Sequence, residues 1–134
     1  MENRERIVIL GAGESGTGAA ILARQKGFDV FVSDAGRINS FYREMLDDFN
    51  IIYESGGHSE RQILNATEVI KSPGIPESVP IVKAIRKKNI RIISEVEFAG
   101  RYTHAKKICI TGSNGKTTTT SLIHHMMRKA GLNV

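Results

Sequence analysis

Short apolar runs alternate with helical patterns over the first hundred residues of the chain. Residues 7–10 read Ile-Val-Ile-Leu, a continuous apolar run that is typical of a strand buried on both faces of a parallel sheet. An Ala- and Leu-rich stretch over about 16–26 predicts a helix, with Gly27 as its C-terminal cap. The same reasoning predicts strands at 30–32, 51–53, 68–71 and 91–93, and helices near 41–49, 59–65, 81–85 and 95–101.

This order of elements predicts an α/β fold. Five strands connected by helices favour a Rossmann-like, doubly wound parallel sheet over residues 1–102, with helices on both sides. In the second of these helices, one apolar face is formed by Phe41, Met45, Leu46 and Phe49.

A second unit is predicted from residue 103 onward. Lys107 to Thr111 reads as its first strand and 115–130 as its first helix, with an apolar stripe of Leu122, Ile123, Met126, Met127 and Ala130. We interpret 103–134 as the start of a truncated ATPase domain. Its apolar face, over 107–130, is expected to dock on the first domain, to self-associate with another molecule, or to stay mobile.

The composition is that of an ordinary globular protein, with 40% apolar and 25% charged residues. The net charge of +5 comes from 19 basic and 14 acidic side chains, but the basic residues occur in short pairs such as Lys87-Lys88, and there is no Trp for bases to stack on. We therefore expect no nucleic-acid partner. A positive surface suits phosphorylated small molecules, or simply solubility.

Cysteine content and hydropathy restrict the location. Cys109 is the one cysteine, so no internal disulfide can form, which fits a reducing cytosol. It lies between Ile108 and Ile110 and is interpreted as strand packing rather than as a nucleophile. No apolar run is long enough to cross a membrane, and residues 1–6 lack the apolar core of a signal peptide. We expect a cytoplasmic protein with no membrane partner.

A glycine-rich turn follows the first predicted strand. Residues 11–16 read Gly-Ala-Gly-Glu-Ser-Gly, which matches the dinucleotide-binding pattern between a buried strand and a helix. Asp34 ends the next strand, where a carboxylate can accept hydrogen bonds from a ribose hydroxyl. The pattern favours a nucleotide ligand, by default NAD. The alternative is a turn that only packs the helix onto the sheet.

A second turn, Ser72-Pro73-Gly74-Ile75, ends the strand at 68–71. Ligands of open α/β sheets bind at the carboxyl ends of the strands, so this turn is predicted to face the same cleft as 11–16. Gly74 permits close backbone approach and Ser72 offers a hydroxyl. The sequence is equally typical of an ordinary Pro-Gly turn.

The clearest chemistry lies at 110–120, which read Ile-Thr-Gly-Ser-Asn-Gly-Lys-Thr-Thr-Thr-Thr. A Gly-rich turn before a helix collects backbone N–H groups around phosphates, the Lys116 ammonium adds a full positive charge, and the Thr117 hydroxyl is placed to ligate Mg²⁺. The full P-loop pattern has a glycine where Ile110 stands, so the match is partial. The predicted phosphate-binding residues are Gly112, Ser113, Asn114, Gly115, Lys116, Thr117 and Thr118.

The other titratable residues carry weaker predictions. His58 is expected at a loop surface, and His124 and His125 on the outside of the last helix. Glu95 and Glu97 are interpreted as acids that favour a helix N-terminus. With no cysteine or carboxylate at ligand spacing around the histidines, no metal cage made by the protein is predicted.

Together these residues resemble the Mur ligases of peptidoglycan synthesis. The resemblance rests on 11–16 after the first strand, Asp34 after the second, 72–75 and 110–117, and it spans the whole chain. Within the family, the chain most resembles the members that add D-glutamate to UDP-N-acetylmuramoyl-L-alanine. It covers only the N-terminal part of the family's length, namely the UDP-binding domain and the opening of the ATPase domain. The P-loop variant without the first glycine is usual in that family.

The resemblance implies a uridine diphosphate ligand in place of NAD. By matching position, the substrate contacts are Gly13, Glu14, Ser15, Asp34, Ala35, Ser72, Pro73 and Gly74. Ala35 stands where some relatives carry a hydroxyl residue, so any hydrogen bond from that side chain is lost. ATP phosphates bind at 112–118 by the same resemblance, with Lys116 on the β and γ oxygens and Thr117 beside Mg²⁺. These last two residues carry the implied catalytic roles.

The implied reaction forms an amide in two steps. ATP phosphorylates the carboxylate of UDP-N-acetylmuramoyl-L-alanine, and the amine of D-glutamate then displaces phosphate from the acyl phosphate. Mg²⁺ and the P-loop lysine neutralise charge on the transferring group. The family also needs metal-binding acids and histidines, a carbamylated lysine and a C-terminal domain, whose positions are absent from these 134 residues. The chain by itself is therefore predicted to be inactive.

Other functions remain open at this stage. A free-standing NAD-binding regulatory module uses only the first turn, and a small P-loop NTPase or interaction domain uses only the last. Within the family, the competitor is the ligase that adds L-alanine, whose Gly-rich turn typically has more glycines and a Met, unlike Gly13-Glu14-Ser15-Gly16. Titration with UDP and with NADH separates these hypotheses.

Overall fold

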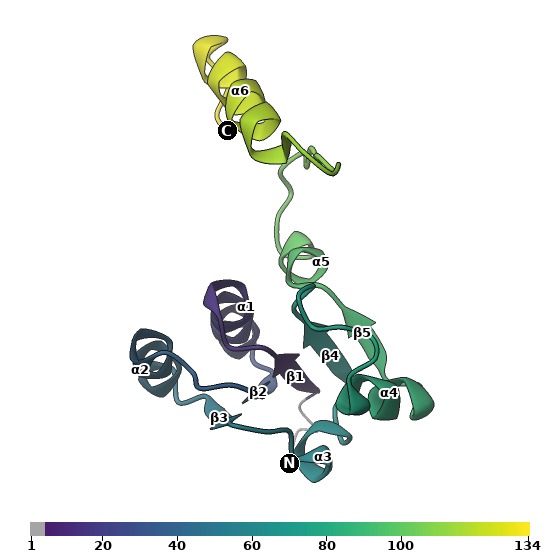
Figure 1. Cartoon of the computed structure of the whole chain (residues 1–134). Helices are drawn as coiled ribbons and strands as arrows, with labels where there is room; N and C mark the ends of the chain where they lie inside the picture. Colours follow the sequence, from purple (N-terminus) through teal and green to yellow (C-terminus); the bar gives the residue numbers. More distant parts are fainter. Residues whose placement is uncertain (1–4) are drawn as a thin grey trace. The chain divides into compact units, whose positions relative to one another are not determined.

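A computed structural model describes residues 5–134 of the chain. These residues divide into two compact units, one ending at Thr103 and the other running from His104 to Val134 (Figure 1). Residues 1–4, which contributed to the signal-peptide argument, lie outside the described residues. No helix of the described chain is both long and apolar enough to cross a membrane.

The first unit contains five parallel strands in the order β3-β2-β1-β4-β5. They are β1 (Arg6–Leu10), β2 (Asp29–Asp34), β3 (Ile52–Ser55), β4 (Glu68–Lys71) and β5 (Arg91–Ile93). The chain proceeds outward from β1 on both sides, so the strand order reverses between β1 and β4. In open sheets of this kind, ligands bind at the carboxyl ends of the strands around that point. The predicted doubly wound α/β sheet is confirmed.

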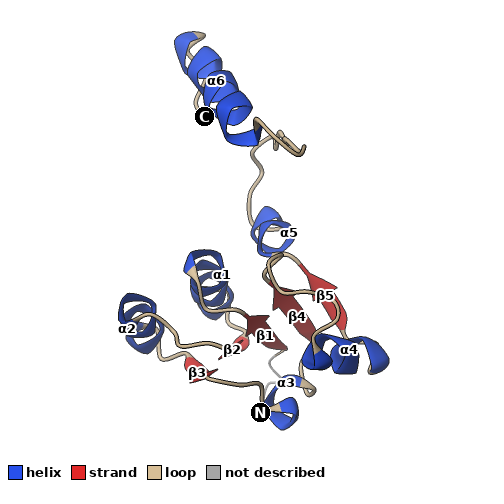
Figure 2. Cartoon of the chain, in the orientation of Figure 1, coloured by secondary structure: helices blue, strands red, loops and turns tan. Residues whose placement is uncertain are grey.

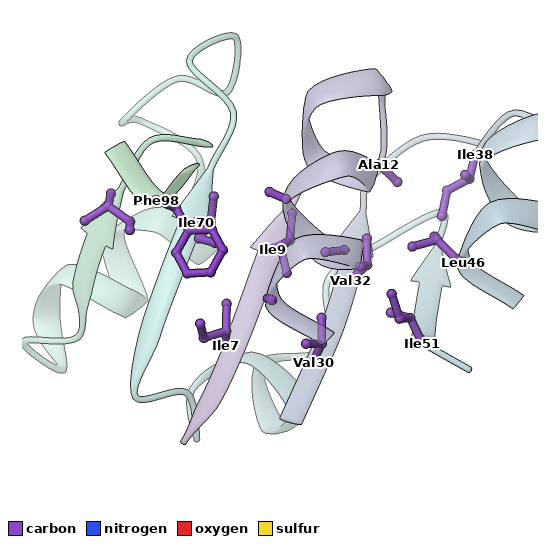
Figure 3. Close-up of a cluster of buried hydrophobic side chains, with 14 residues drawn as sticks. Ile7, Ile9, Ala12, Val30, Val32, Ile38, Leu46, Ile51, Ile70 and Phe98 are labelled. Atoms are coloured by element: carbon purple, nitrogen blue, oxygen red, sulfur yellow. The ribbon is translucent and has the colours of Figure 1, made fainter. Parts of the chain in front are cut away.

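Helices cover both faces of this sheet (Figure 2). They are α1 (Glu14–Gln25), α2 (Ser40–Asp48), α3 (Glu60–Ile63), α4 (Pro80–Lys87) and α5 (Glu95–Gly100). The pleat of a strand sends alternate side chains to opposite sides. Ile7 and Ile9 accordingly pack into the cluster shared with α1, α2 and α5 (Figure 3), whereas Val8 and Leu10 pack with α3 and α4.

Local sequence sets the helix ends. Gly27 has a φ of +89°, and its N–H donates to the carbonyl of Arg24 while the N–H of Phe28 donates to the carbonyl of Ala23. This is a Schellman motif, so the predicted glycine cap of α1 is confirmed. α5 begins with a capping residue, because the Ser94 hydroxyl accepts the N–H of Glu97 at 3.1 Å.

The predicted apolar face of the second helix is partly wrong. Leu46 is fully buried, but Phe41 is 62% exposed, and Tyr42 packs against the core instead. Five residues at about 100° each place Phe41 roughly 140° around the helix from Leu46. With Leu46 against the sheet, Phe41 therefore lies toward solvent.

The second unit contains α6 (Lys116–Lys129) and no strand among its described residues. The predicted strand at 107–111 is wrong, because no ladder of the described chain includes these residues. A strand persists only where a neighbouring backbone pairs along its length. Cys109 is exposed, so its predicted packing is also wrong. The apolar stripe of α6 is uncovered as well, since none of its residues is buried.

Candidate functional site

The glycine-rich turn 11–16 joins β1 to α1, and its glycines meet different requirements. Gly11 has a φ of +97°, and a Cβ there would lie 2.9 Å from Ser72 Oγ. A Cβ on Gly16 would lie 1.9 Å from the carbonyl oxygen of Gly11, so only glycine lets α1 approach the strand end this closely. Gly13 has open space around its Cα and caps α1 without a side-chain hydrogen bond. The first N–H groups of α1 are thus accessible to an anionic ligand.

Asp34, at the end of β2, connects this turn to the next loop. Its Oδ2 accepts the Ala12 N–H at 2.7 Å, and its Oδ1 accepts the Gly36 N–H at 2.7 Å. The carboxylate is therefore held in one orientation by backbone donors from two loops. Each carboxylate oxygen has a second lone pair, so Asp34 can still accept a hydrogen bond from a ligand.

A pocket of about 250 Å³ lies above the carboxyl ends of β1, β2 and β4. Its apolar part comes from the connection between β4 and α4, and its polar part from the ends of β2 and β3. Ligand pockets span roughly 300–1,000 Å³, so this pocket suits part of a ligand, such as a planar base. The lining residues are Gly11, Asp34, Ala35, His58, Gly74, Ile75, Pro76 and Val79.

The turn at 72–75 is stabilised by hydrogen bonds among its own residues and from the neighbouring Lys71. The N–H of Ile75 donates to the carbonyl of Ser72 at 3.1 Å, and Lys71 Nζ donates to the carbonyl of Ile75 at 2.7 Å. Gly74 lines the pocket, as predicted from its position at a strand end. The Ser72 hydroxyl donates instead to Glu95 Oε1 at 2.6 Å, so it is engaged with α5. Glu95 is itself buried, which makes it more than an acid that favours a helix N-terminus.

The end of β3 contributes a polar cluster. The register pairs Ser33 with Glu54, so their side chains share a face of the sheet. Ser33 Oγ lies 2.6 Å from Glu54 Oε1 and 2.7 Å from His58 Nδ1, and the Ser59 N–H donates to Glu54 Oε1 at 2.8 Å. Burial raises the pKa of Glu54, but the hydrogen bonds from Ser33 and Ser59 lower it below its ordinary value.

His58 is a pocket residue that sequence reasoning missed. The predicted loop-surface position is wrong, because the side chain is half-buried and lines the pocket beside Ala35. His58 follows β3, the strand that pairs with β2. The rule that ligands bind at the carboxyl ends of parallel strands applies to this loop as well, and could have identified the residue.

The structure brings the two predicted turns at 11–16 and 72–75, together with Asp34, to one edge of the sheet. Of the predicted substrate residues, Asp34, Ala35 and Gly74 line the pocket. Gly13, Glu14 and Ser15 lie exposed at the start of α1, and Ser15 lines a separate groove with Glu95 and Val96. Ser72 and Pro73 lie in the turn itself but outside the pocket lining.

The predicted phosphate loop precedes α6 in the second unit. Gly112 and Gly115 have φ values of +150° and +76°, and Gly115 caps α6 without a side-chain hydrogen bond. The Lys116 ammonium donates to the carbonyl of Gly112 within the loop. A lysine hydrogen-bonded only to exposed carbonyls can exchange them for phosphate oxygens. The other predicted residues of this loop, Ser113, Asn114, Thr117 and Thr118, are exposed.

Metal ligands from the protein are sparse. Nowhere in residues 5–134 do three His, Cys, Asp or Glu side chains gather in a way that could hold an ion. A Mg²⁺ ion at this loop would be held by the Thr117 hydroxyl and by nucleotide phosphates.

Two family descriptions match the chain. Residues 6–79 match the MurD N-terminal domain, and residues 110–134 match the Mur ligase middle domain. The UDP-N-acetylmuramoylalanine–D-glutamate ligase of Bacteroides fragilis is 62% identical over 97% of this chain and 29% of its own length. The ligase of the same name from Porphyromonas gingivalis is 59% identical over 96% of this chain and 28% of its own length. The chain thus spans less than a third of these relatives.

Solved structures show the same fold. A murein peptide ligase from Psychrobacter arcticus superposes with a TM-score of 0.68 at 25% identity, over 95% of this chain and 27% of that chain. A pseudomurein peptide ligase type C from Methanothermus fervidus gives 0.66 at 27% identity, over 98% of this chain and 29% of that chain.

Proposed function

The chain belongs to the MurD family of Mur ligases, over the N-terminal domain and the start of the middle domain, and from this premise we propose that it binds UDP-N-acetylmuramoyl-L-alanine by its UDP moiety. In this proposal, residues 1–102 form the UDP-binding domain and 103–134 begin the ATP-binding domain. The observation that carries it is the pocket at the carboxyl edge of the sheet, where the ends of three neighbouring strands supply Gly11, Asp34 and Gly74.

The pocket residues fit a base, and the start of α1 fits a diphosphate. Ile75, Pro76 and Val79 offer apolar surface for a planar ring, while Asp34 can accept hydrogen bonds from ribose hydroxyls. The exposed N–H groups of Glu14 and Ser15 in the first turn of α1 receive phosphate oxygens, favoured by the partial positive charge of the helix N-terminus. Ala35 contributes only its methyl group and backbone.

The loop at 112–118 fits ATP phosphates. Its two glycines with positive φ turn the backbone before an uncapped helix, and Lys116 supplies a mobile positive charge. We assign Lys116 to the β and γ oxygens and Thr117 to Mg²⁺. When bound, ATP would supply the phosphoryl group that activates a carboxylate, and Mg²⁺ would neutralise charge on its oxygens. The residues of this chain orient that group and neutralise its charge.

For the whole protein we propose a peptidoglycan precursor ligase. The carboxylate of UDP-N-acetylmuramoyl-L-alanine takes the phosphoryl group of ATP, the amine of D-glutamate attacks the acyl carbon, and phosphate leaves as the amide forms. In this proposal, the residues described here bind the substrate and the ATP phosphates. We expect no turnover from the 134 residues alone, because they gather no acid or histidine cluster for a metal within the described range.

Calorimetric titration of the chain tests the binding proposal. We expect UDP to bind and NADH not to bind. Ala35→Phe should abolish UDP binding by filling the pocket, with the unfolding temperature unchanged since Ala35 is exposed. The matched control is Gln25→Phe, an exposed position at the opposite end of α1. Binding of NADH without UDP would overturn the proposal.

We also propose that the chain self-associates weakly through residues 107–130. Ile108, Leu122 and Met126 are 53%, 57% and 61% exposed, which supports a contact with a second copy. Sedimentation velocity over a range of concentrations tests this, with Met126→Asp expected to leave only the monomer. A single species at all concentrations in the unmodified chain would contradict it.

A further inference from the structure

The hydroxyl of Ser33 determines which groups donate and which accept in the polar cluster at the end of β3. A hydroxyl has one proton to donate. Glu54 Oε1, at 2.6 Å, is a charged acceptor, whereas the carbonyl of Gly57 is 3.4 Å away. Charge-assisted hydrogen bonds are shorter and stronger than neutral ones, so the proton of Ser33 lies on the Glu54 side. Glu54 in turn is an acceptor only, and it also receives the Ser59 N–H.

This direction determines the tautomer of His58. Its Nδ1 lies 2.7 Å from Ser33 Oγ, whose proton is already given to Glu54. Nδ1 must therefore carry a proton and donate to Ser33. A neutral imidazole with a proton on Nδ1 has an acceptor at Nε2. Within residues 5–134 no hydrogen bond occupies Nε2, so this acceptor is available to a ligand in the pocket that His58 lines.

We propose that His58 reads the base of the nucleotide, its Nε2 accepting the N3–H of uracil. This inference rests on the proposed UDP function. Uracil presents a ring N–H at this position, whereas cytosine presents an unprotonated ring nitrogen, which is itself an acceptor. Two acceptors that face each other lose the hydrogen bond and leave His58 Nε2 unpaired on binding. The pocket thereby selects uracil over cytosine.

The same cluster explains how a histidine in a loop can hold its Nε2 in a fixed position toward a ligand. His58 follows two glycines, Gly56 and Gly57, a sequence that alone would leave its side chain free to move. Ser33, which is fully buried, and Glu54 anchor the ring through Nδ1. A side chain whose rotamer is fixed by a buried partner loses less entropy when it binds. Ser33 and Glu54 are positioning residues in this arrangement, and His58 is the contact residue.

Calorimetric competition between UDP and CDP tests the proposal in the chain itself. We expect UDP to bind at least about tenfold more tightly than CDP, the value of one hydrogen bond. His58→Phe keeps a ring of similar size but has no nitrogen, so UDP affinity should fall about tenfold, whereas CDP affinity should not fall, because no acceptor is left unpaired. The matched control, His124→Phe on the exposed surface of α6, should change neither.

The outcomes separate the two proposals. If the unmodified chain binds no UDP, the proposed function fails and the inference fails with it. If UDP binds and His58→Phe leaves the ratio of UDP to CDP affinity unchanged, only the role of His58 is overturned. Thermal unfolding by circular dichroism shows whether the variant is folded.

Nitrogen NMR of the unmodified chain gives a second test that needs no variant. Long-range ¹H–¹⁵N spectra should show His58 with a protonated Nδ1 and an unprotonated Nε2. The Nε2 resonance should move when UDP is added and stay in place with CDP. A proton on Nε2 in the free protein would overturn the proposal.

Discussion

Residues 11–16 and 112–118 both form a glycine-rich turn that leads into a helix, but their surroundings differ. The first turn follows β1, whose Val8, Ile9 and Leu10 are fully buried between two paired strands. The second follows residues 107–111, which belong to no sheet of the described chain and include the half-exposed Ile108. The difference shows that the turn and the helix arise from local sequence, whereas the strand requires neighbours.

The two turns also hold their charges differently. At the first, Asp34 accepts backbone donors from two loops, so the site is joined to the next strand by hydrogen bonds. At the second, Lys116 donates to the carbonyl of Gly112 in its own loop. The first site is therefore stabilised by tertiary structure, and the second by contacts within a few residues.

A pair of leucine substitutions tests the difference in packing. Leu46→Ala in α2 removes a fully buried side chain and should lower the free energy of unfolding by about 2–5 kcal/mol. Leu122→Ala in α6 removes a side chain that is 57% exposed and should change the free energy of unfolding by less than about 0.5 kcal/mol. Urea unfolding followed by circular dichroism measures both. Similar losses would mean that the apolar face of α6 is covered in solution.

Two glycines of α1 test the close approach at the first turn. Gly16→Ala places a Cβ 1.9 Å from the carbonyl oxygen of Gly11. It should destabilise the first unit by roughly 1–3 kcal/mol, because a backbone carbonyl cannot move aside as a flexible side chain can. Gly18→Ala, two residues on and in open space, should stabilise it by up to about 1 kcal/mol. Thermal melts of the two variants provide the comparison. Equal melting temperatures would show that α1 can shift away from the strand.

Removal of the lysine tests whether the second turn binds phosphate. Lys116→Ala should weaken binding of a non-hydrolysable ATP analogue with Mg²⁺ about tenfold, because a charge-assisted hydrogen bond is lost. UDP affinity and the melting temperature should stay the same, since Lys116 is exposed and lies outside the first unit. Calorimetry with each nucleotide distinguishes the effects. A parallel loss of UDP binding would contradict the assignment of the two turns to different ligands.

The smallest expected effect concerns Glu54 and pH. The pKa of Glu54 is lowered in the folded protein, so its ionised form stabilises the fold at neutral pH, and this contribution is lost as the pH falls through the lowered pKa. Glu54→Gln should therefore reduce the stability lost on acidification below about pH 5, by less than about 1 kcal/mol because the carboxylate is only half-buried. Glu44→Gln, an exposed acid of α2, is the control. Identical pH profiles for Glu54→Gln and the unmodified chain would exclude this role.

Most of the first unit could be predicted from its sequence. The strands at 68–71 and 91–93 and the glycine cap at 27 are found where the pattern placed them, because buried strands read as apolar runs and positive φ favours glycine. Phe41 could not be placed, since the orientation of α2 depends on how Leu46 meets the sheet. His58 was missed as a pocket residue: the rule for parallel strand ends points to its loop, but only the pairing of β2 with β3 places that loop beside the site.

By itself, the sequence determined the order of helices and strands, the two glycine-rich turns and the family, because these depend on residues that are near one another along the chain. Tertiary structure alone decided that Ser72 faces Glu95, that Asp34 joins two loops and that His58 is anchored by Ser33. The contacts of Ser72 with Glu95, of Asp34 with Ala12 and of Ser33 with His58 each join residues more than twenty positions apart. Their geometry depends on strand order and register, which no local pattern specifies.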